Sequence, residues 1–417
     1  MKEAIAGLTT FVTMAYCLII IPQMLATPGT GLDFHAVLSA TVLVSFCSTL
    51  LMGLYANLPY GMSPGMGLSA FFTFTLLLEQ KIPWPIALGI VFWSGIIFLL
   101  LAASPFCHLF IKAVPQSLRV AATIGIGIFI TFVGLKNAAI IVSEPQTLVK
   151  LGPLTLKTLL CVLGLSVALF LTHRKNPFAF LTAITIVTLC GWLLGLIETP
   201  QSWVSYPDFS ALAFKADIWG ALKLQYIPAM LSFVFTALFD AMATFSGIAQ
   251  ANHMIAADGQ PLRLKQGLVS TALSTVAASM IGTSSGGAVV ESYAGIAVGG
   301  RTGRTALFTA LCFLPCFFFA PAISFVPPYA TASVLILVGC SMFSSVRDLQ
   351  TKNIEEILPA FLTIILIPLT FSITQGVIWG LAAHVICFAL CGRAKEISLL
   401  LFSIVTIWLA LILTQLD

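Results

Sequence analysis

Apolar runs long enough to cross a lipid bilayer follow one another along almost the whole chain. A helical span needs about 20 apolar residues, and only 8% of the residues here are charged, where a soluble domain has roughly 25%. The pattern predicts an all-α polytopic membrane protein embedded in a lipid bilayer. Fifteen candidate spans can be drawn, at about residues 4–22, 36–54, 64–78, 84–103, 117–136, 155–171, 177–197, 226–250, 264–282, 287–298, 302–320, 329–346, 355–371, 374–391 and 397–414.

The basic residues indicate which way the spans run, because Lys and Arg are enriched in cytoplasmic loops. With a cytoplasmic N-terminus, thirteen basic residues, including every Arg, fall inside and six Lys residues fall outside. We therefore expect a multi-pass protein of the cell (inner or plasma) membrane whose N-terminus is cytoplasmic. Residues 201–225 form the longest outer loop, and the stretch 211–222 within it is a candidate interfacial helix.

Two of the spans begin in the same unusual way. The third starts NLPYGMSPGMGLSAFF and the tenth GTSSGGAVVESYAG, so each has a stretch rich in Gly, Ser and Pro before a helix too short to cross. Such paired, interrupted segments indicate the midplane site of a secondary transporter, although Gly-rich stretches also align by chance. The offset of 221 residues covers seven spans, an odd number, and so predicts inverted repeats. It aligns Gly61 with Gly282, Ser63 with Ser284, and Gly65 with Gly286.

Two acidic residues lie inside apolar stretches, Asp240 in the eighth candidate span and Glu291 in the tenth. The other thirteen Asp and Glu residues fall in loops, at helix ends or at the termini. A carboxylate at mid-membrane depth is costly and usually functional. Asp240 shares a helix face with Thr236 and Thr244, as expected beside a substrate cavity or a proton path. The alternative for Asp240 is a structural acid bonded to a neighbouring helix.

Glu291 is expected at the N-terminus of the short tenth helix, where free N–H groups and the helix dipole stabilise an anion. That position suits a group that binds N–H donors and exchanges a proton, and the alternative is a carboxylate that only caps the helix. The glycines before it let a ligand approach the backbone closely. We therefore include Gly287 and Ala288, with the backbone of residues 286–288, in the predicted substrate site.

Further candidates come from the third and first spans. Ser69 begins the short third helix, with Phe71 and Phe72 beside it, and Tyr16 lies in the first span. A hydroxyl and aromatic rings opposite Glu291 would suit a flat ligand with polar edges, although each ring on its own is ordinary in a membrane helix. His384 is the one histidine well inside a span, either as an interhelical hydrogen-bond donor or as a proton relay.

Other kinds of chemistry find little support in the sequence. The ten cysteines and five histidines show no spacing typical of zinc or a redox pair, and no phosphate loop or hydrolase motif occurs. The net charge of +4 is spread over the loops, which gives no reason to expect nucleic acid. We predict no catalytic residues, no metal and no cofactor. An intramembrane enzyme would need a nucleophile and base that two acids do not supply, and a two-acid site suits a carrier better than a channel.

Six segments carry a family resemblance, in order along nearly the whole chain. They resemble the AzgA-like adenine/guanine/hypoxanthine permeases of the nucleobase–cation symporter-2 (xanthine/uracil permease) superfamily. The segments are GLTTFVTMAY (7–16), LLMGLYANLPYGMSPGMGLSAFF (50–72), GIGIFITFVGLKNA (125–138), LFDAMATFSGIA (238–249), VVESYAGIAVGGRTGRTA (289–306) and LPAFLTIILIPLTFSITQGVIWG (358–380).

The resemblance implies about fourteen transmembrane segments in two inverted seven-helix repeats, with short strands and half-helices in segments three and ten. It implies a core domain (residues 1–115 and 226–322) and a gate domain (residues 116–200 and 323–417), with residues 201–225 as the outer loop. It also implies secondary active, proton-coupled uptake of a purine nucleobase. Oligomeric state stays open, and a homodimer is one of the alternatives.

The mechanism we expect is alternating access, in which the gate domain moves against the core domain. Glu291 and Asp240 would accept hydrogen bonds from the N–H groups of the purine and carry the coupled proton. The backbone at Ser69 and at residues 286–288 would complete the rim of the site.

Three departures from the family pattern bear on the substrate. Ser69 stands where the family commonly has Asn, Ala237 stands where it commonly has a second Asp, and a fifteenth candidate span exceeds the expected fourteen. One lost hydrogen-bonding group can change discrimination between similar ligands greatly, so Glu291 is expected to carry more of the recognition. Uracil or xanthine as substrate, sodium as the coupled cation, and an anion transporter on the same fold remain the alternatives.

Overall fold

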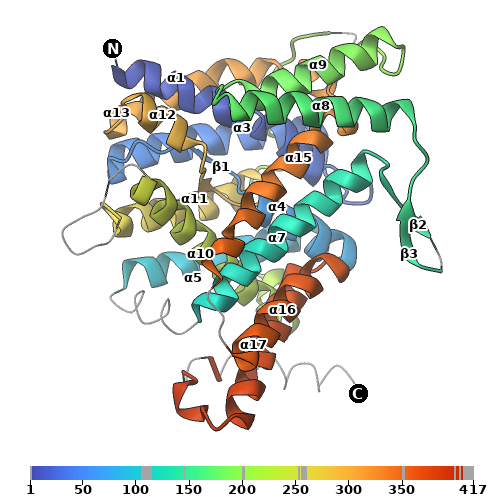
Figure 1. The fold of residues 1–417 in the computed structure, drawn as a ribbon. Helices are drawn as coiled ribbons and strands as arrows, with labels where there is room; N and C mark the ends of the chain where they lie inside the picture. Colours follow the sequence, from blue (N-terminus) through green and yellow to red (C-terminus); the bar gives the residue numbers. More distant parts are fainter. Residues whose placement is uncertain are drawn as a thin grey trace.

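A computed structural model describes residues 2–104, 115–144, 146–199, 202–251, 254, 261–349, 353–398, 401–402 and 405–406, and it is predominantly helical (Figure 1). The first half of the chain contains α1 (Lys2–Met14), α2 (Cys17–Leu25), α3 (Phe34–Leu51), the π-helical η1 (Met52–Ala56), β1 (Met62–Ser63), α4 (Met66–Ala70), the π-helical η2 (Phe71–Glu79), α5 (Trp84–Ala103), α7 (Gln116–Asn137), β2 (Ile141–Glu144), β3 (Leu148–Leu151), α8 (Leu156–His173) and α9 (Ala179–Leu193).

The second half contains the 3-10 turns η3 (Gly220–Leu222) and η4 (Leu224–Tyr226), α10 (Ile227–Ala251), α11 (Leu264–Ile281), β4 (Gly287–Ala288), α12 (Ser292–Val298), α13 (Gly303–Phe313), η5 (Leu314–Phe318), α14 (Ala320–Ser324), α15 (Pro328–Phe343), η6 (Ser344–Asp348), α16 (Ile354–Leu369), α17 (Ile373–Leu390) and η7 (Ala394–Glu396).

Several helices begin at a capping side chain. Asp33 Oδ2 accepts a hydrogen bond from Ala36 N (2.9 Å) at the start of α3. Ser372 Oγ accepts one from Gln375 N (3.3 Å) at the start of α17. Each cap satisfies a backbone N–H that has no partner within the helix. These polar residues end the loops and mark where the apolar runs become helical.

Many of the helices have membrane length, as predicted. Within the described residues, those long and apolar enough to cross a bilayer are Lys2–Leu25, Phe34–Ala56, Trp84–Ala103, Gln116–Asn137, Leu156–His173, Leu224–Ser246 and Pro328–Asp348. The third predicted span is shorter, at Met66–Glu79, and α12 of the tenth has only 7 residues. The fifteenth candidate span, 397–414, lies mostly outside the described residues. The count of fourteen and the inverted repeat stay predictions.

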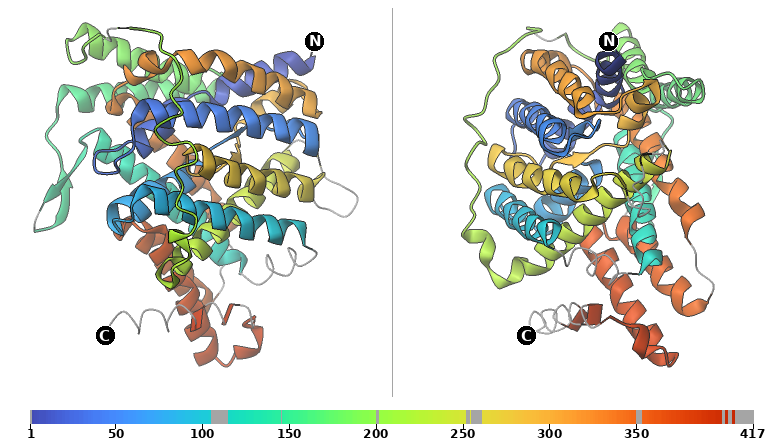
Figure 2. Two further views of the ribbon diagram at one scale, coloured as in Figure 1. Left: turned by 180° about the vertical axis from the view of Figure 1, so that it is seen from behind. Right: turned by 90° about the vertical axis from the view of Figure 1, so that its left-hand side faces the viewer.

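The helices form two groups. In the first, α13, α3, α11 and α5 lie side by side, and Figure 2 (right) presents them end-on as a column. Helix α1 packs on α12 and α13, and α10 packs on α5. In the second group, α7 packs on α15 and α16, α8 and α9 pack on α15, and α17 packs on α16. The first group draws on the residues predicted for the core domain and the second on those predicted for the gate domain.

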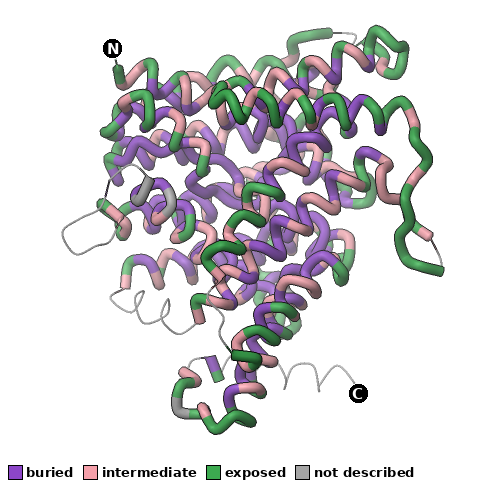
Figure 3. The backbone as a smooth tube through the Cα atoms, viewed as in Figure 1, coloured by how far each residue is buried: buried purple, intermediate pink, exposed green. Residues whose placement is uncertain are grey.

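Buried residues concentrate in the middle of the molecule, where the two groups meet (Figure 3). Large apolar side chains are exposed along α8 and α9, among them Leu169, Phe170 and Trp192. An exposed apolar surface of this extent is typical of contact with a membrane or a partner. It fits the prediction that these helices face lipid.

The segment predicted as an interfacial helix, residues 211–222, is not a continuous helix. It contains turns and the 3-10 turn η3. Its backbone N–H groups bond to other parts of the chain: Phe214 N donates to Met280 O (2.7 Å) and Asp217 N to Pro85 O (2.8 Å). Phe214 also has a left-handed φ of 56°. Because these N–H groups are used across the fold, the i→i−4 pattern cannot form, and the segment straps the ends of α5 and α11.

The outer loop after α7 folds into a hairpin that the sequence analysis did not anticipate. Strands β2 and β3 pair antiparallel from Ile141 opposite Leu151 to Glu144 opposite Leu148. The hairpin projects from the helices at the right of Figure 1. Its Lys150 pairs with Glu144 at the surface.

Candidate functional site

Two strands cross at the centre of the first helix group. Met62 of β1 lies opposite Ala288 of β4, and Ser63 lies opposite Gly287, in an antiparallel pair. A further backbone bond joins Val289 N to the carbonyl of the residue before β1 (3.1 Å). The short strands expected in segments three and ten are therefore present, and they bring together two parts of the chain that are far apart in sequence.

Side chains satisfy the remaining backbone groups at this crossing. Thr49 Oγ1 donates to Met62 O (3.1 Å) and accepts from Met62 N (2.9 Å). Ser292 Oγ accepts from Gly61 N (3.0 Å). Non-helical backbone at membrane depth is tolerated only where such partners or a cavity satisfy it. Thr49 and Ser292 thus let the chain leave helical structure at this point.

The spacing of the two crossing segments differs from the glycine alignment. Strand β4 starts at Gly287, 225 residues after β1 starts at Met62. The offset of 221 pairs Ser63 with Ser284, which lies before β4. The difference arises because the second segment needs more residues to leave the preceding helix, since α11 ends at Gly282 with φ of 110°. The predicted offset is therefore wrong by about one helical turn, although both segments are correct.

Glu291 stands at the N-cap position of α12, as predicted, but its carboxylate does not cap the helix. The hydroxyl of Tyr16 donates to Glu291 Oε1 instead, and Thr13 Oγ1 donates to Glu291 O (3.3 Å). Tyr16 can reach it because the predicted first span breaks between α1 and α2 at this residue. The Tyr16 ring also contacts the edge of Phe180 on α9, with centroids 4.9 Å apart. The structure thus brings two predicted site residues into direct contact.

Asp240 lies in α10 and faces the start of α4. A Cβ atom built on Gly65 would be 3.6 Å from Asp240 Oδ2, so only a glycine hydrogen separates the carboxylate from that backbone. Thr236 and Thr244 are buried on the same face of α10. The Thr236 hydroxyl donates to Ser232 O within the helix (2.8 Å). The predicted polar stripe therefore points toward the crossing.

Ser69 and Phe71 are both fully buried in the first helix group. Ser69 Oγ and Ser284 Oγ are 2.7 Å apart and share a hydrogen bond, so Ser69 links the third and tenth segments. The Phe71 ring packs against Phe233 of α10, with centroids 5.6 Å apart. Gly287 and Ala288 are buried in β4. A Cβ atom on Gly287 would meet only Ser63 O, at 4.0 Å, which leaves open space at that position.

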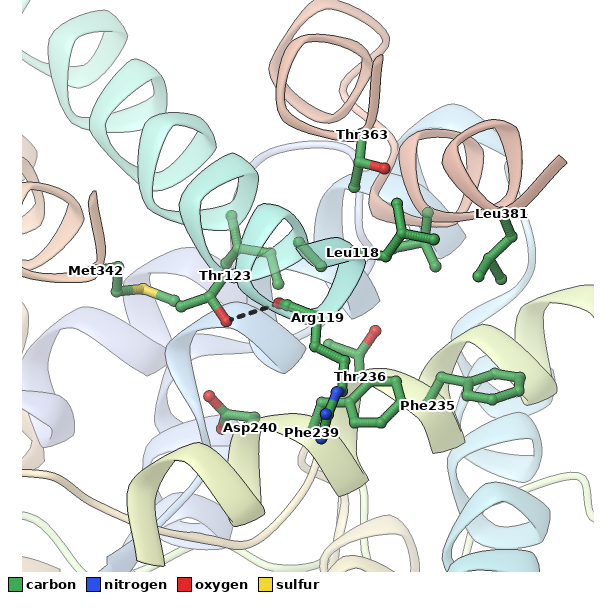
Figure 4. Close-up of a pocket in the computed structure, with 13 residues that line it drawn as sticks. Leu118, Arg119, Thr123, Phe235, Thr236, Phe239, Asp240, Met342, Thr363 and Leu381 are labelled. Atoms are coloured by element: carbon green, nitrogen blue, oxygen red, sulfur yellow. Dashed lines mark hydrogen bonds between the residues drawn. The ribbon is translucent and has the colours of Figure 1, made fainter. Parts of the chain in front are cut away.

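A pocket lies between α10 and the second helix group, and Asp240 forms part of its wall (Figure 4). Its cavity volume is about 30 Å³, room for a water molecule or two. Sequence reasoning missed most of the residues that line it, since they lie in ordinary-looking apolar spans. An Arg inside the span 117–136 was the available signal. The polar and aromatic lining includes Arg119 and Thr123 of α7, Thr236, Phe239 and Asp240 of α10, and Met342 of α15.

A larger cavity of about 390 Å³ lies toward the other end of α7, lined by residues of α2, α7 and α15. Gln23 on α2 bridges the two helix groups there: its Nε2 donates to Val326 O (2.6 Å), and its Oε1 accepts from Thr331 Oγ1 (2.8 Å). Tyr16 lies about two helical turns before Gln23. His384 is distant from these contacts in sequence and packs in α17 against Phe388, with ring centroids 4.0 Å apart.

Comparison with known proteins gives consistent matches. The sequence matches the Permease family over residues 1–378. It is 38% identical to an adenine permease, AdeP, of Escherichia coli strain K12, over 95% of this chain and 89% of that protein. It is 33% identical to a guanine/hypoxanthine permease, PbuG, of Bacillus subtilis strain 168, over 98% and 95%. The fold resembles the transmembrane domain of a cyanobacterial bicarbonate transporter, BicA, with a TM-score of 0.65, 17% identity, and coverage of 90% and 96%.

Proposed function

The chain belongs to the Permease family, and from this premise we propose that it carries purine nucleobases across the membrane as a proton-coupled secondary transporter. Family membership makes it a transporter rather than an enzyme. The matches to an adenine permease and to a guanine/hypoxanthine permease support a purine as substrate. The likeness to a bicarbonate transporter concerns the fold alone.

The observation that carries the proposal is the convergence of two carboxylates on the β1–β4 crossing. Glu291 arrives at the head of α12, just after β4, and Asp240 arrives from α10 beside Gly65. A carboxylate inside the bilayer is expensive unless it serves a ligand or a proton path. Two of them from separate helices, around backbone that lacks side chains, form a site for a small polar ligand.

The chemistry of a purine fits this arrangement. Its ring and exocyclic N–H groups are donors, and carboxylates are acceptors. Glu291 already accepts from the Tyr16 hydroxyl, so its second oxygen is the one offered to substrate. Gly287 leaves room for a flat ring against the backbone of β4. We infer that Glu291 and Asp240 bind the N–H edges of the purine, and that Ser69 supports the site through Ser284.

Proton coupling follows from the same carboxylates. We infer that one of them binds a proton together with the purine on one side of the membrane and releases it on the other. The two helix groups would act as core and gate domains in alternating access. Tyr16 joins Glu291 of the first group to Phe180 of the second, and Gln23 makes a second such link. These contacts support a mechanism in which relative movement of the groups changes access to the site.

Transport by the purified protein in proteoliposomes tests the proposal. Labelled adenine, guanine, hypoxanthine, xanthine and uracil are offered with and without an inward proton gradient, and with sodium replaced by potassium. We expect saturable purine uptake that an acidic outside accelerates and sodium leaves unchanged. Uptake of none of the five would refute nucleobase transport, and uptake of bicarbonate or sulfate in their place would favour the anion alternative.

Glu291→Gln separates the role of this residue from the rest of the proposal. The substitution keeps the shape of the side chain and removes its charge, and we expect loss of proton-driven uptake. The matched control is Glu144→Gln, at a surface pair with Lys150 in the β2–β3 hairpin, which should transport normally. If Glu291→Gln took up purine at the wild-type rate with the same pH dependence, the assignment of Glu291 would be wrong.

A further inference from the structure

Two opposite charges line the pocket between α7 and α10 without forming an ion pair. Asp240 belongs to α10 and Arg119 to α7, and among the described residues around the pocket these two carry the charges. Figure 4 shows the Arg119 side chain running from α7 toward α10, where it ends beside Phe239. The two residues therefore belong to the two helix groups that are proposed to move against each other.

The surroundings of Arg119 do not satisfy its guanidinium. Its Nε is buried and has no hydrogen-bond partner among the described residues. The guanidinium carbon lies 5.8 Å from the centre of the Phe239 ring. A guanidinium carries five N–H donors and stays charged, and a buried donor without a partner costs free energy. The aromatic ring offers a cation–π contact, but no acceptor for the N–H groups.

A small displacement would bring Arg119 to the carboxylate. Phe239 and Asp240 are consecutive, so their Cα atoms lie about 3.8 Å apart. The planar fork of an arginine can bind both oxygens of a carboxylate. On the side of α4 the carboxylate faces Gly65, which has no side chain to block it. Rotation of the Arg119 side chain, or a slide of α7 along α10, is enough to form the pair.

We propose that Arg119 is the counter-ion that Asp240 takes up when the carrier returns without substrate. This inference rests on the proposed function. In the loaded carrier, the ligand and its proton engage the carboxylate, and Arg119 lies on Phe239. In the empty carrier, an unpaired carboxylate would have to pass through a closed, mostly apolar interface, which is costly. Pairing with Arg119 removes that cost and closes the pocket between the two groups.

The proposal separates two modes of transport that share the same substrate site. Net uptake requires the empty carrier to return, whereas exchange of purine inside for purine outside uses only loaded forms. Removal of Arg119 should therefore slow net uptake and spare exchange. The measured quantity is the ratio of net uptake to exchange in proteoliposomes, with whichever labelled purine the wild-type protein transports.

For Arg119→Gln we expect this ratio to fall at least tenfold, with exchange within about twofold of wild type. Arg119→Gln combined with Asp240→Asn should restore the ratio, because no carboxylate charge is left to compensate. The matched control is Arg174→Gln, since Arg174 also lies on an aromatic ring, Phe170 at 5.3 Å, but outside the pocket. If Arg119→Gln does not assemble, Arg119→Met, which keeps a long apolar stem, takes its place in the same measurement.

An unchanged ratio in an assembled Arg119 variant would overturn the counter-ion role. Equal loss of net uptake and exchange would also overturn it, and would assign Arg119 to substrate binding instead. Failure of the wild-type protein to transport or exchange any purine would instead refute the proposed function, so the two failures are distinguishable.

Discussion

Alanine substitutions at the adjacent residues Gly286 and Gly287 should have opposite consequences for folding and transport. A Cβ atom on Gly286 would lie 1.6 Å from Ser274 Oγ and 2.6 Å from Ser274 Cβ. A Cβ atom on Gly287 would meet only Ser63 O, at 4.0 Å. Neither glycine has a positive φ, so alanine is compatible with both backbones. The difference between them is therefore one of space.

The cost at Gly286 follows from how Ser274 is held. Its hydroxyl shares a short hydrogen bond with Ser48 of α3, so it cannot turn away without losing that partner. Overpacking of a close-packed interior costs about 1–3 kcal/mol, and the lost hydrogen bond adds about 1 kcal/mol. Gly286→Ala should lower the free energy of unfolding by about 2–4 kcal/mol. Gly287→Ala should leave stability within about 0.5 kcal/mol of wild type.

At Gly287 the effect should appear in transport. The added methyl group fills space proposed for the flat purine ring, and one methyl group in a binding pocket changes discrimination by about 1–3 kcal/mol, or roughly 10–200-fold. Gly287→Ala should therefore assemble normally and raise KM for purine at least tenfold. Thermal melting of the purified protein in detergent measures the first property, and proteoliposome uptake measures the second.

Two results would refute this reasoning. Equal melting temperatures for Gly286→Ala and wild type would mean that the close approach to Ser274 is absent. Wild-type KM in Gly287→Ala would mean that substrate does not lie against β4. Combining Gly286→Ala with Ser274→Gly removes the clashing atoms and should recover most of the lost stability.

Two further predictions concern links between the helix groups. Tyr16→Phe removes the donor to Glu291; a hydrogen bond to a charged group contributes about 1.5–3 kcal/mol, so kcat/KM for purine uptake should fall at least tenfold, whereas Tyr60→Phe, whose hydroxyl has no partner among the described residues, should be near wild type, and similar values for both variants would count against the Tyr16 role. Gln23→Leu removes the bonds to Val326 and Thr331 at nearly constant volume, so a cysteine placed at Thr27 beside the larger cavity should react faster with a polar thiol reagent, and an unchanged labelling rate would show that Gln23 does not hold the groups together.

Sequence patterns were sufficient for the features that depend on local chemistry. Apolar runs of membrane length predicted the helices, and the Gly-rich starts of segments three and ten predicted the irregular backbone where β1 and β4 pair. Asp240 and Glu291 stood out because charge is rare in an apolar span. These signals need only the composition of one segment, and the structure keeps each of them.

Contacts between distant segments were beyond reach of the sequence. Tyr16 is one of seven tyrosines in the chain, and its bond to Glu291 depends on the break between α1 and α2 and on the approach of α12. The turns in residues 211–222 arise because their N–H groups bond to α5 and α11 neighbours, which no local pattern reveals. Arg119 looked like a topological charge at the end of a span until α10 was seen beside it.

The β1–β4 pairing also constrains how the protein can be made. Met62 and Ser63 emerge from the ribosome 225 residues before their partners Gly287 and Ala288, so for most of synthesis the outward edge of β1 has no strand to bond with at membrane depth. Thr49 can hold Met62 during that interval, since it lies just upstream on α3. Assembly of the binding site must therefore be a late step in biogenesis, and a chain that stops before residue 287 would expose unpaired backbone to quality control in the membrane.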